Sequence, residues 1–215
     1  LLVGLLNGDM KILFTDHFSR YSIDPDDELI DVNFTTGNDD ILLATAKGKA
    51  IRFPEDQVRP MGRQARGVTG IRMGIDDRVI GMEVIGDGQG TLLTITRSGF
   101  GKRTALSEYP VKNRGGQGVI TIKNTARLGD VVAVQMVEDS DHLLILTSGG
   151  KIIRLRMEEI SVIGRNTMGR TLVRMDTGEH VVDVARAEAS EEDEKASEEV
   201  EESLEPNLTE DLLAK

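Results

Sequence analysis

Residues 92–110 read LLTITRSGFGKRTALSEYP, and the same arrangement returns as ILLATAKGKAIRFPEDQVR at 41–59 and as LLILTSGGKIIRLRMEEIS at 143–161. The copies are 51 residues apart, and no gap is needed to align them. The register holds at the equivalent positions Thr45, Thr96 and Thr147; Gly48, Gly99 and Gly150; Arg52, Arg103 and Arg154; Arg63, Arg114 and Arg165; Gly67, Gly118 and Gly169. A fixed period of this length indicates a domain built from repeated structural units.

Each copy contains two apolar runs of four to six residues separated by a glycine-containing turn. Runs of that length bounded by turn residues predict β-strands, and the glycine can supply the positive φ that a tight hairpin needs. A further strand is predicted after each Gly67-type position, at 68–73, 119–123 and 170–175. Four strands per unit of about 50 residues predict an all-β, propeller-like domain of four-stranded blades.

The repeat divides the chain of 215 residues into three parts. Residues 1–23 are predicted to form a partial blade, and residues 24–187 to form three regular units and a closing strand at 179–187 that completes the preceding blade. Residues 188–215 hold 12 acidic and 2 basic side chains with few apolar ones, a composition typical of a disordered tail. We expect this tail to compete with a polyanion for the basic part of the domain.

The composition excludes several classes of protein. There is no cysteine, which rules out disulfide frameworks and thiolate zinc sites and is compatible with the reducing cytosol. The apolar start at residues 1–6 is too short for a signal sequence or a membrane span. A cytoplasmic protein without membrane contact is therefore predicted.

Charge is segregated in the same phase of each repeat. Segments 47–72, 97–127 and 151–174 together contain 20 basic and 5 acidic residues, whereas the rest of residues 1–187 contains 4 basic and 20 acidic ones. Repeated units place equivalent positions at the same height around an axis, so these segments should join into one curved positive band. A long, curved polyanion is the expected partner.

Double-stranded DNA is the polyanion that the composition favours. Single strands and RNA are bound largely by stacking on exposed aromatic rings, and this chain has five Phe, two Tyr and no Trp. Contacts to phosphates would then dominate, with little reading of base sequence. The predicted DNA-binding residues are Arg52, Arg63, Arg66, Arg72, Lys102, Arg103, Lys112, Arg114, Lys123, Lys151, Arg154, Arg165, Arg170 and Arg174.

No catalytic or metal-binding constellation is predicted. His17, His142 and His180 are isolated, without a second ligand at metal-binding spacing. The glycine-rich stretch 86–90 lacks the Lys-Ser/Thr ending of a phosphate loop and is interpreted as a turn. We expect a non-catalytic, cofactor-free binding domain.

Several stretches resemble the C-terminal domain of the bacterial DNA gyrase A protein: 62–73, 99–104 with 108–110, 115–123 and 159–167. The resemblance spans about residues 24–187 and implies a β-pinwheel, whose four-stranded blades exchange strands with their neighbours and bend DNA around a positive rim. The family's first-blade box, a Gln followed by a basic double-glycine run, is only approached by residues 112–118.

The resemblance also implies a role in a larger enzyme. In that family the wrapped DNA is presented to an N-terminal cleavage core, and with gyrase B, ATP and magnesium the complex introduces negative supercoils at the nucleoid. The catalytic tyrosine lies outside this domain, so Tyr21 and Tyr109 should be structural. Two alternatives stay open: the corresponding domain of topoisomerase IV, which directs substrate choice, and a protein-binding propeller of the chromosome-condensation-regulator type.

Overall fold

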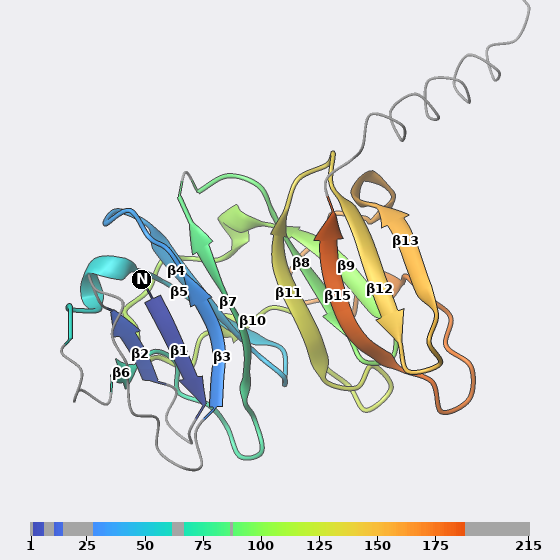
Figure 1. The fold of residues 1–215 in the computed structure, drawn as a ribbon, viewed down its shortest axis with the longest axis horizontal. Helices are drawn as coiled ribbons and strands as arrows, with labels where there is room; N and C mark the ends of the chain where they lie inside the picture. Colours follow the sequence, from blue (N-terminus) through green and yellow to red (C-terminus); the bar gives the residue numbers. More distant parts are fainter. Residues whose placement is uncertain (1, 7–10, 15–27, 62–66, 87, 188–215) are drawn as a thin grey trace, which may run out of the picture.

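The computed structural model describes residues 2–6, 11–14, 28–61, 67–86 and 88–187. Its described part contains four small antiparallel sheets that stand next to one another in chain order, from the blue to the red end of Figure 1. Single-turn 3-10 helices follow three of the hairpins, at Glu55–Gln57, Leu106–Glu108 and Met157–Glu159. The predicted all-β fold is confirmed.

Each sheet is built around one β-hairpin. The hairpins consist of β1 (Leu2–Leu6) with β2 (Lys11–Phe14), β4 (Asp40–Thr45) with β5 (Lys49–Pro54), β8 (Thr91–Thr96) with β9 (Phe100–Ala105), and β12 (His142–Thr147) with β13 (Ile152–Arg156). In the last three, the glycine of the turn has φ between +77° and +81° and donates its N–H to the threonine carbonyl three residues earlier, at 2.9–3.0 Å. The predicted hairpin turns are therefore present.

The inner strand of every sheet comes from the next stretch of the chain. These inner strands are β3 (Glu28–Asn33), β7 (Val79–Ile85), β11 (Val131–Val137) and β15 (Val181–Ala187), and each pairs with the first strand of the preceding hairpin. Successive inner strands contact one another across the sheets. The strand predicted at 179–187 is present as β15 and pairs with β12, but the sheet that it joins has three described strands instead of four.

The outer strand of a sheet is donated by a more distant unit. The donor strands are β6 (Val68–Thr69), β10 (Val119–Ile120) and β14 (Arg170–Thr171), which pair with β2, β5 and β9. This is the strand exchange that the resemblance implied. The donors have two residues instead of the predicted five or six, because the backbone beyond them bonds to the next unit instead of to a sheet: Arg72 and Lys123 donate their N–H groups to Gly116 O and Thr167 O, both at 2.8 Å.

The hydrophobic core lies between the sheets in three clusters. Alternate residues of β4 face different clusters: Ile41 and Leu43 pack in one, Leu42 and Ala44 in the next. A strand covered on both faces must be apolar at every position, which explains the unbroken apolar runs of the sequence. The predicted domain boundaries stay predictions, and the acidic tail at 188–215 lies outside the described residues.

Candidate nucleic-acid interface

The basic segments meet where the loop of one unit lies along the donor strand of the unit before it. In the first such contact Gly115 donates its N–H to Gly70 O at 2.6 Å, and Arg72 donates to Gly116 O at 2.8 Å. In the second, Lys123 donates to Thr167 O at 2.8 Å. Both contacts lie at the outer edge of the sheets, beside the donor strands and opposite the inner strands.

Arg114 and Arg165 are anchored by the same device in successive units. Their backbone N–H groups donate to Gln57 Oε1 at 2.8 Å and to Glu108 Oε2 at 2.9 Å, respectively. Their guanidinium groups donate to the carbonyl oxygens of Thr69 at 2.9 Å and Ile120 at 3.0 Å. A guanidinium has five N–H donors, so each side chain is held in place while donors are left for a ligand.

Arg72, Lys123 and Arg174 occupy one phase of the repeat, 51 residues apart, and all three are exposed. Among the described residues none of them forms an ion pair with a carboxylate. Exposed basic side chains also lie at Lys112 and on β14. We call the following set the basic rim: Arg72, Lys112, Arg114, Lys123, Arg165, Arg170 and Arg174.

Other predicted binding residues lie elsewhere or are already engaged. Arg52 Nε is 2.7 Å from Asp40 Oδ2, and its side chain is only 12% exposed. Lys151 Nζ is 2.7 Å from Asp176 Oδ2, and the hydrogen bond to this carboxylate raises the pKa of Lys151. Arg154 is exposed on β13, at the far end of the array. Arg63 and Arg66 lie outside the described residues.

Lys102 and Arg103 are buried, which the charge pattern did not predict. Lys102 Nζ donates to Gly164 O at 2.7 Å, Arg165 O at 2.6 Å and Thr167 Oγ1 at 3.1 Å. Burial lowers the pKa of this ammonium to about 8, so it remains mostly protonated at neutral pH. Arg103 donates from Nε to Ile160 O at 2.9 Å and pairs with Asp139. These two side chains hold the loop that carries Arg165. We therefore assign them the role of positioning this loop instead of contacting DNA.

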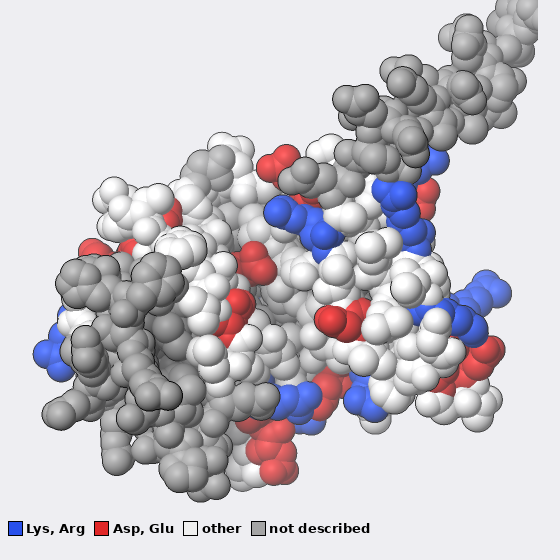
Figure 2. Space-filling view, in the orientation of Figure 1, with Lys and Arg blue, Asp and Glu red and all other residues white. Residues whose placement is uncertain are grey.

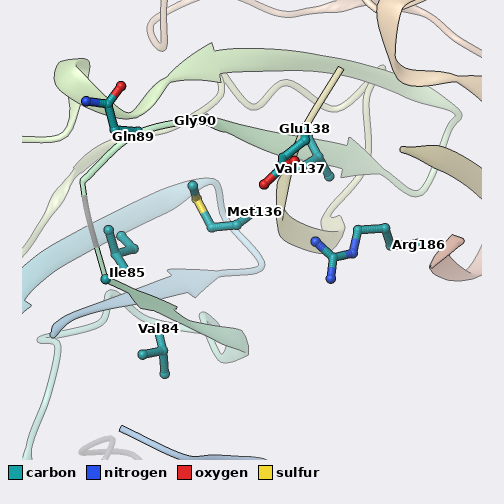
Figure 3. Close-up of a pocket in the computed structure, with 9 residues that line it drawn as sticks. Val84, Ile85, Gln89, Gly90, Met136, Val137, Glu138 and Arg186 are labelled. Carbon is teal, nitrogen blue, oxygen red and sulfur yellow. The ribbon is translucent and has the colours of Figure 1, made fainter. Parts of the chain in front are cut away.

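The side of the array formed by the inner strands differs from the basic rim, because it carries acidic side chains as well as basic ones. Burial, together with the neighbouring Asp31, raises the pKa of Glu83, on β7, to about 7. Beside this strand lies a cavity of about 360 Å³, lined mainly by apolar side chains of β7 and β11 with Glu138 and Arg186 at its edge (Figure 3). Glu138 and Arg186 have opposite charges, so this cavity has no excess of positive charge.

Basic and acidic groups alternate over the visible face of the molecule. In Figure 2, Lys and Arg lie in several separate groups, at the edges and in the upper middle of the view, and Asp and Glu lie between them. Within the described ranges no group of three or more His, Asp or Glu could hold a metal ion, and no helix is long and apolar enough to span a membrane. The arrangement can therefore present spaced cations to an extended anion along the rim.

Tyr109 is placed in the core. Its hydroxyl lies 2.6 Å from Thr121 Oγ1, and burial raises the pKa of the phenol. A buried phenol in this state is a poor nucleophile, which agrees with the structural role expected for it. Tyr21 lies outside the described residues.

Sequence reasoning missed Gln57 and Glu108, the acceptors that fix the loops carrying Arg114 and Arg165. The signal was present, because these two residues are also 51 apart. The two residue types differ, so identity at the repeat position does not reveal the pair, although a neutral amide and a carboxylate perform the same acceptor role.

Residues 39–85, 90–138 and 141–188 match the family described as DNA gyrase C-terminal domain, beta-propeller, and the three matches begin 51 residues apart. The chain is 44% identical over 197 residues to the DNA gyrase A protein of Salmonella typhimurium, covering 88% of this chain and 22% of that protein. It is 46% identical over 160 residues to the DNA gyrase A protein of Escherichia coli strain K12, covering 74% and 18%. The chain thus spans about a fifth of the length of these relatives.

Solved structures agree on the fold. A DNA gyrase A C-terminal domain matches with a TM-score of 0.75 at 21% identity, over 86% of this chain and 64% of that chain. The C-terminal domain of a DNA topoisomerase IV matches with a TM-score of 0.79 at 23% identity, over 94% and 66%. The matched repeat units and the sequence relatives confirm the resemblance, and the chain belongs to the family of DNA gyrase C-terminal domains.

Proposed function

We propose that this chain binds duplex DNA along the basic rim and bends it there. The observation that carries the proposal is the repetition of exposed Arg72, Lys123 and Arg174 in one phase of successive units. Each follows a donor strand, so the three cations are spaced along the outside of the array, as an extended phosphate backbone requires. Family membership supports the same function.

Backbone contact is the mode that this surface favours. The rim side chains are Arg and Lys, which bind phosphates, and the chain's few aromatic residues include Tyr109 and Phe53 in the core. Bending a duplex costs several kcal/mol, which distributed phosphate contacts can offset. We infer little base specificity and a preference for easily bent DNA.

The relatives indicate the larger enzyme in which the domain works. In a DNA gyrase A protein, the bent segment would be passed through a cleavage core elsewhere in the polypeptide, with gyrase B, ATP and magnesium, to introduce negative supercoils. We propose the cytoplasm, at the nucleoid, as the location of this activity. No residue of this chain is assigned a chemical step, and its contribution is to hold and orient DNA.

The salt dependence of binding tests the proposal. If the seven residues of the basic rim each neutralise one phosphate, log K for a duplex should fall with log salt at a slope of about −6. Equal affinities are expected for duplexes that differ in sequence but bend equally easily. A slope near zero, as for a protein-binding propeller, would contradict the proposal.

A triple variant locates the interface. Replacing Arg72, Lys123 and Arg174 by Ala should reduce the slope by about three and leave the melting temperature nearly unchanged, because exposed charges add little to stability. A matched control replaces Lys47, Arg78 and Arg97, which are also exposed but lie outside the rim; Lys47 and Arg78 pair with Asp130. Equal losses in the two variants would show general attraction without a defined rim.

A further inference from the structure

Apolar side chains are exposed beside the cations of the basic rim. Of the eleven large apolar side chains that are exposed in the described part of the chain, four lie in two stretches, 111–120 and 162–171, which also carry Arg114 and Arg165. Each of the four lies within three residues of a member of the basic rim, so apolar and cationic side chains are interleaved in the same segments. We call the following set the apolar rim residues: Val111, Ile120, Val162 and Met168, which are 51%, 41%, 49% and 45% exposed.

The repeat itself accounts for the exposure of the two valines. Val111 and Val162 are 51 residues apart, and each forms a parallel β-bridge with an equivalent arginine, Arg52 or Arg103. The residue after each valine donates its N–H to the carbonyl of that arginine, at 2.8 Å and 2.9 Å. Pro60, in the same phase of the unit before, is also exposed. An exposed apolar side chain at this place is therefore a property of the repeat unit.

The other two apolar rim residues lie where one unit meets the next. Arg165 donates from Nη1 to Ile120 O at 3.0 Å, so its guanidinium lies against the donor strand β10 of the preceding unit. Met168 follows Arg165 by three residues in the same loop. A ligand bound by Arg165 is therefore close to exposed apolar side chains as well.

Apolar groups interleaved with cations match the chemistry of a DNA strand. Clustered exposed apolar side chains mark interaction surfaces. The centre of a protein–protein interface is depleted of lysine, whereas Val111 is directly followed by Lys112. Along a DNA strand, charged phosphates alternate with deoxyribose, which lacks the 2′-hydroxyl of RNA and is apolar at that carbon. A cation on the phosphate and an aliphatic side chain on the sugar would each meet a matching group.

We propose that the apolar rim residues pack against the deoxyribose of the bound duplex and thereby select DNA over RNA. The proposal rests on the proposed function, because it assigns a second kind of contact to the same rim. The sugar is the same at every nucleotide, so these contacts add affinity without reading base sequence. A ribose would press its 2′-hydroxyl against an aliphatic side chain that cannot form a hydrogen bond, and burying an unpaired hydroxyl is costly.

Replacing Val111 and Val162 together by Thr tests the contacts. Thr is β-branched like Val and suits extended backbone, so the melting temperature should stay at the wild-type value. In an anisotropy titration the duplex should bind about fourfold more weakly for each substitution, because one methyl group that the sugar would bury becomes a hydroxyl. The salt slope should not change, since no charge is removed. The matched control replaces Val32 and Val182, exposed valines of the inner strands β3 and β15, by Thr and should bind as wild type.

A duplex with a ribonucleotide at every fifth position of both strands tests the selection. It carries the same charge as the DNA duplex, so a difference in affinity cannot come from the number of phosphates. The wild-type chain should bind it about threefold more weakly than DNA. The Thr double variant should bind both duplexes equally, because the threonine hydroxyl can pair with a 2′-hydroxyl. Val111→Ile combined with Val162→Ile keeps the apolar contact and should retain the selection.

Three results would overturn the proposal: wild-type DNA affinity in the Thr double variant, an equal loss in the control variant, or equal binding of the two duplexes by the wild-type chain. A smaller salt slope in the Thr double variant would also overturn it, since the loss would then come from displaced cations. If these tests fail while the wild-type slope is about −6, DNA binding along the rim stands without the sugar contacts. A wild-type slope near zero would instead contradict the proposed function, so the two proposals fail on different measurements.

Discussion

Two equivalent loops of this molecule rest on different supports. The loop at 113–118 lies over Ile51, where a Cβ added at Gly116 would be 3.4 Å from the Ile51 Cδ1 atom. The loop at 164–169 lies over Lys102, which is Ile51 shifted by 51 residues and is equally buried. Its ammonium donates to the carbonyls of Gly164 and Arg165. An apolar contact in one unit and a fully hydrogen-bonded cation in the next thus hold the equivalent loop.

The difference shows that position in the repeat sets geometry, while side-chain chemistry can vary if every polar group is satisfied. The first loop has glycines at 115 and 116, and the second has Asn166 and Thr167. Thr167 accepts from Lys102 and donates to Gly164 O at 2.7 Å, so loop and support are matched. Exchanging one member of either pair should therefore be costly.

The largest loss of stability is expected for Ile51→Lys. The variant would place an ammonium in the first core cluster, under a loop that has no threonine at the equivalent of Thr167, and a buried charge whose hydrogen bonds are incomplete is strongly unfavourable. We expect a loss of about 4 kcal/mol in the free energy of unfolding, measured by urea titration. Ile51→Val is the control and should lose about 1 kcal/mol. Equal losses would mean that volume alone matters at this position.

Lys102→Ile is the reverse exchange and should cost less, about 2 kcal/mol. It removes a buried charge, which is favourable, but leaves the carbonyl of Arg165 without its donor. The rim residue Arg165 should become more mobile, so DNA affinity should fall. The stability of the other sheets should stay unchanged. Hydrogen exchange of residues 164–169 measures the loosening directly. Unchanged exchange would show that the loop does not depend on Lys102.

The pH dependence of stability gives a second measurement on Lys102. Its pKa in the folded chain is about 8, below the ordinary value of 10.5, because burial disfavours the charged form. Between these values the unfolded state holds the proton and the folded state has released it, so this group makes stability rise with pH from about 8 to 10.5. The rise should be absent in Lys102→Ile, and a rise of the same size in both proteins would assign it to other groups.

Arg114→Ala and Arg165→Ala compare the anchored arginines. Arg114 donates from Nε to Gln57 O at 2.9 Å as well as to Thr69 O, and its loss should cost about 1 kcal/mol. Arg165 is exposed at its contact with Ile120 O, and its loss should cost about half as much stability. Each variant should lower the DNA salt slope by about one. If a variant loses stability but keeps the wild-type salt slope, the arginine that it lacks has a structural role only.

The sequence was sufficient for the hairpins, since Gly48, Gly99 and Gly150 mark turns that local geometry alone requires. It was not sufficient for the burial of Lys102. Residues 101–104 are all buried, because β9 is a central strand covered by sheets on both faces, and that depends on partners distant in the chain. A count of charges by phase cannot distinguish a lysine facing Gly164 O from one facing solvent. The short donor strands escaped prediction for the same reason.

The smallest effect is expected for Glu108→Gln, which makes the second loop resemble the first. Gln57 already shows that an amide oxygen can accept the backbone N–H at this place, so stability should change by less than about 0.5 kcal/mol. The exchange removes a negative charge beside Arg165, and a rim facing phosphates should then bind DNA about twofold more tightly at low salt. Gln57→Glu is the matched reverse and should weaken binding by about the same factor. Both differences should shrink as salt is raised, because the Debye length falls from about 10 Å at 0.1 M to about 3 Å at 1 M. A twofold change that persisted at high salt would point to an altered loop geometry, which hydrogen exchange at Arg165 would detect.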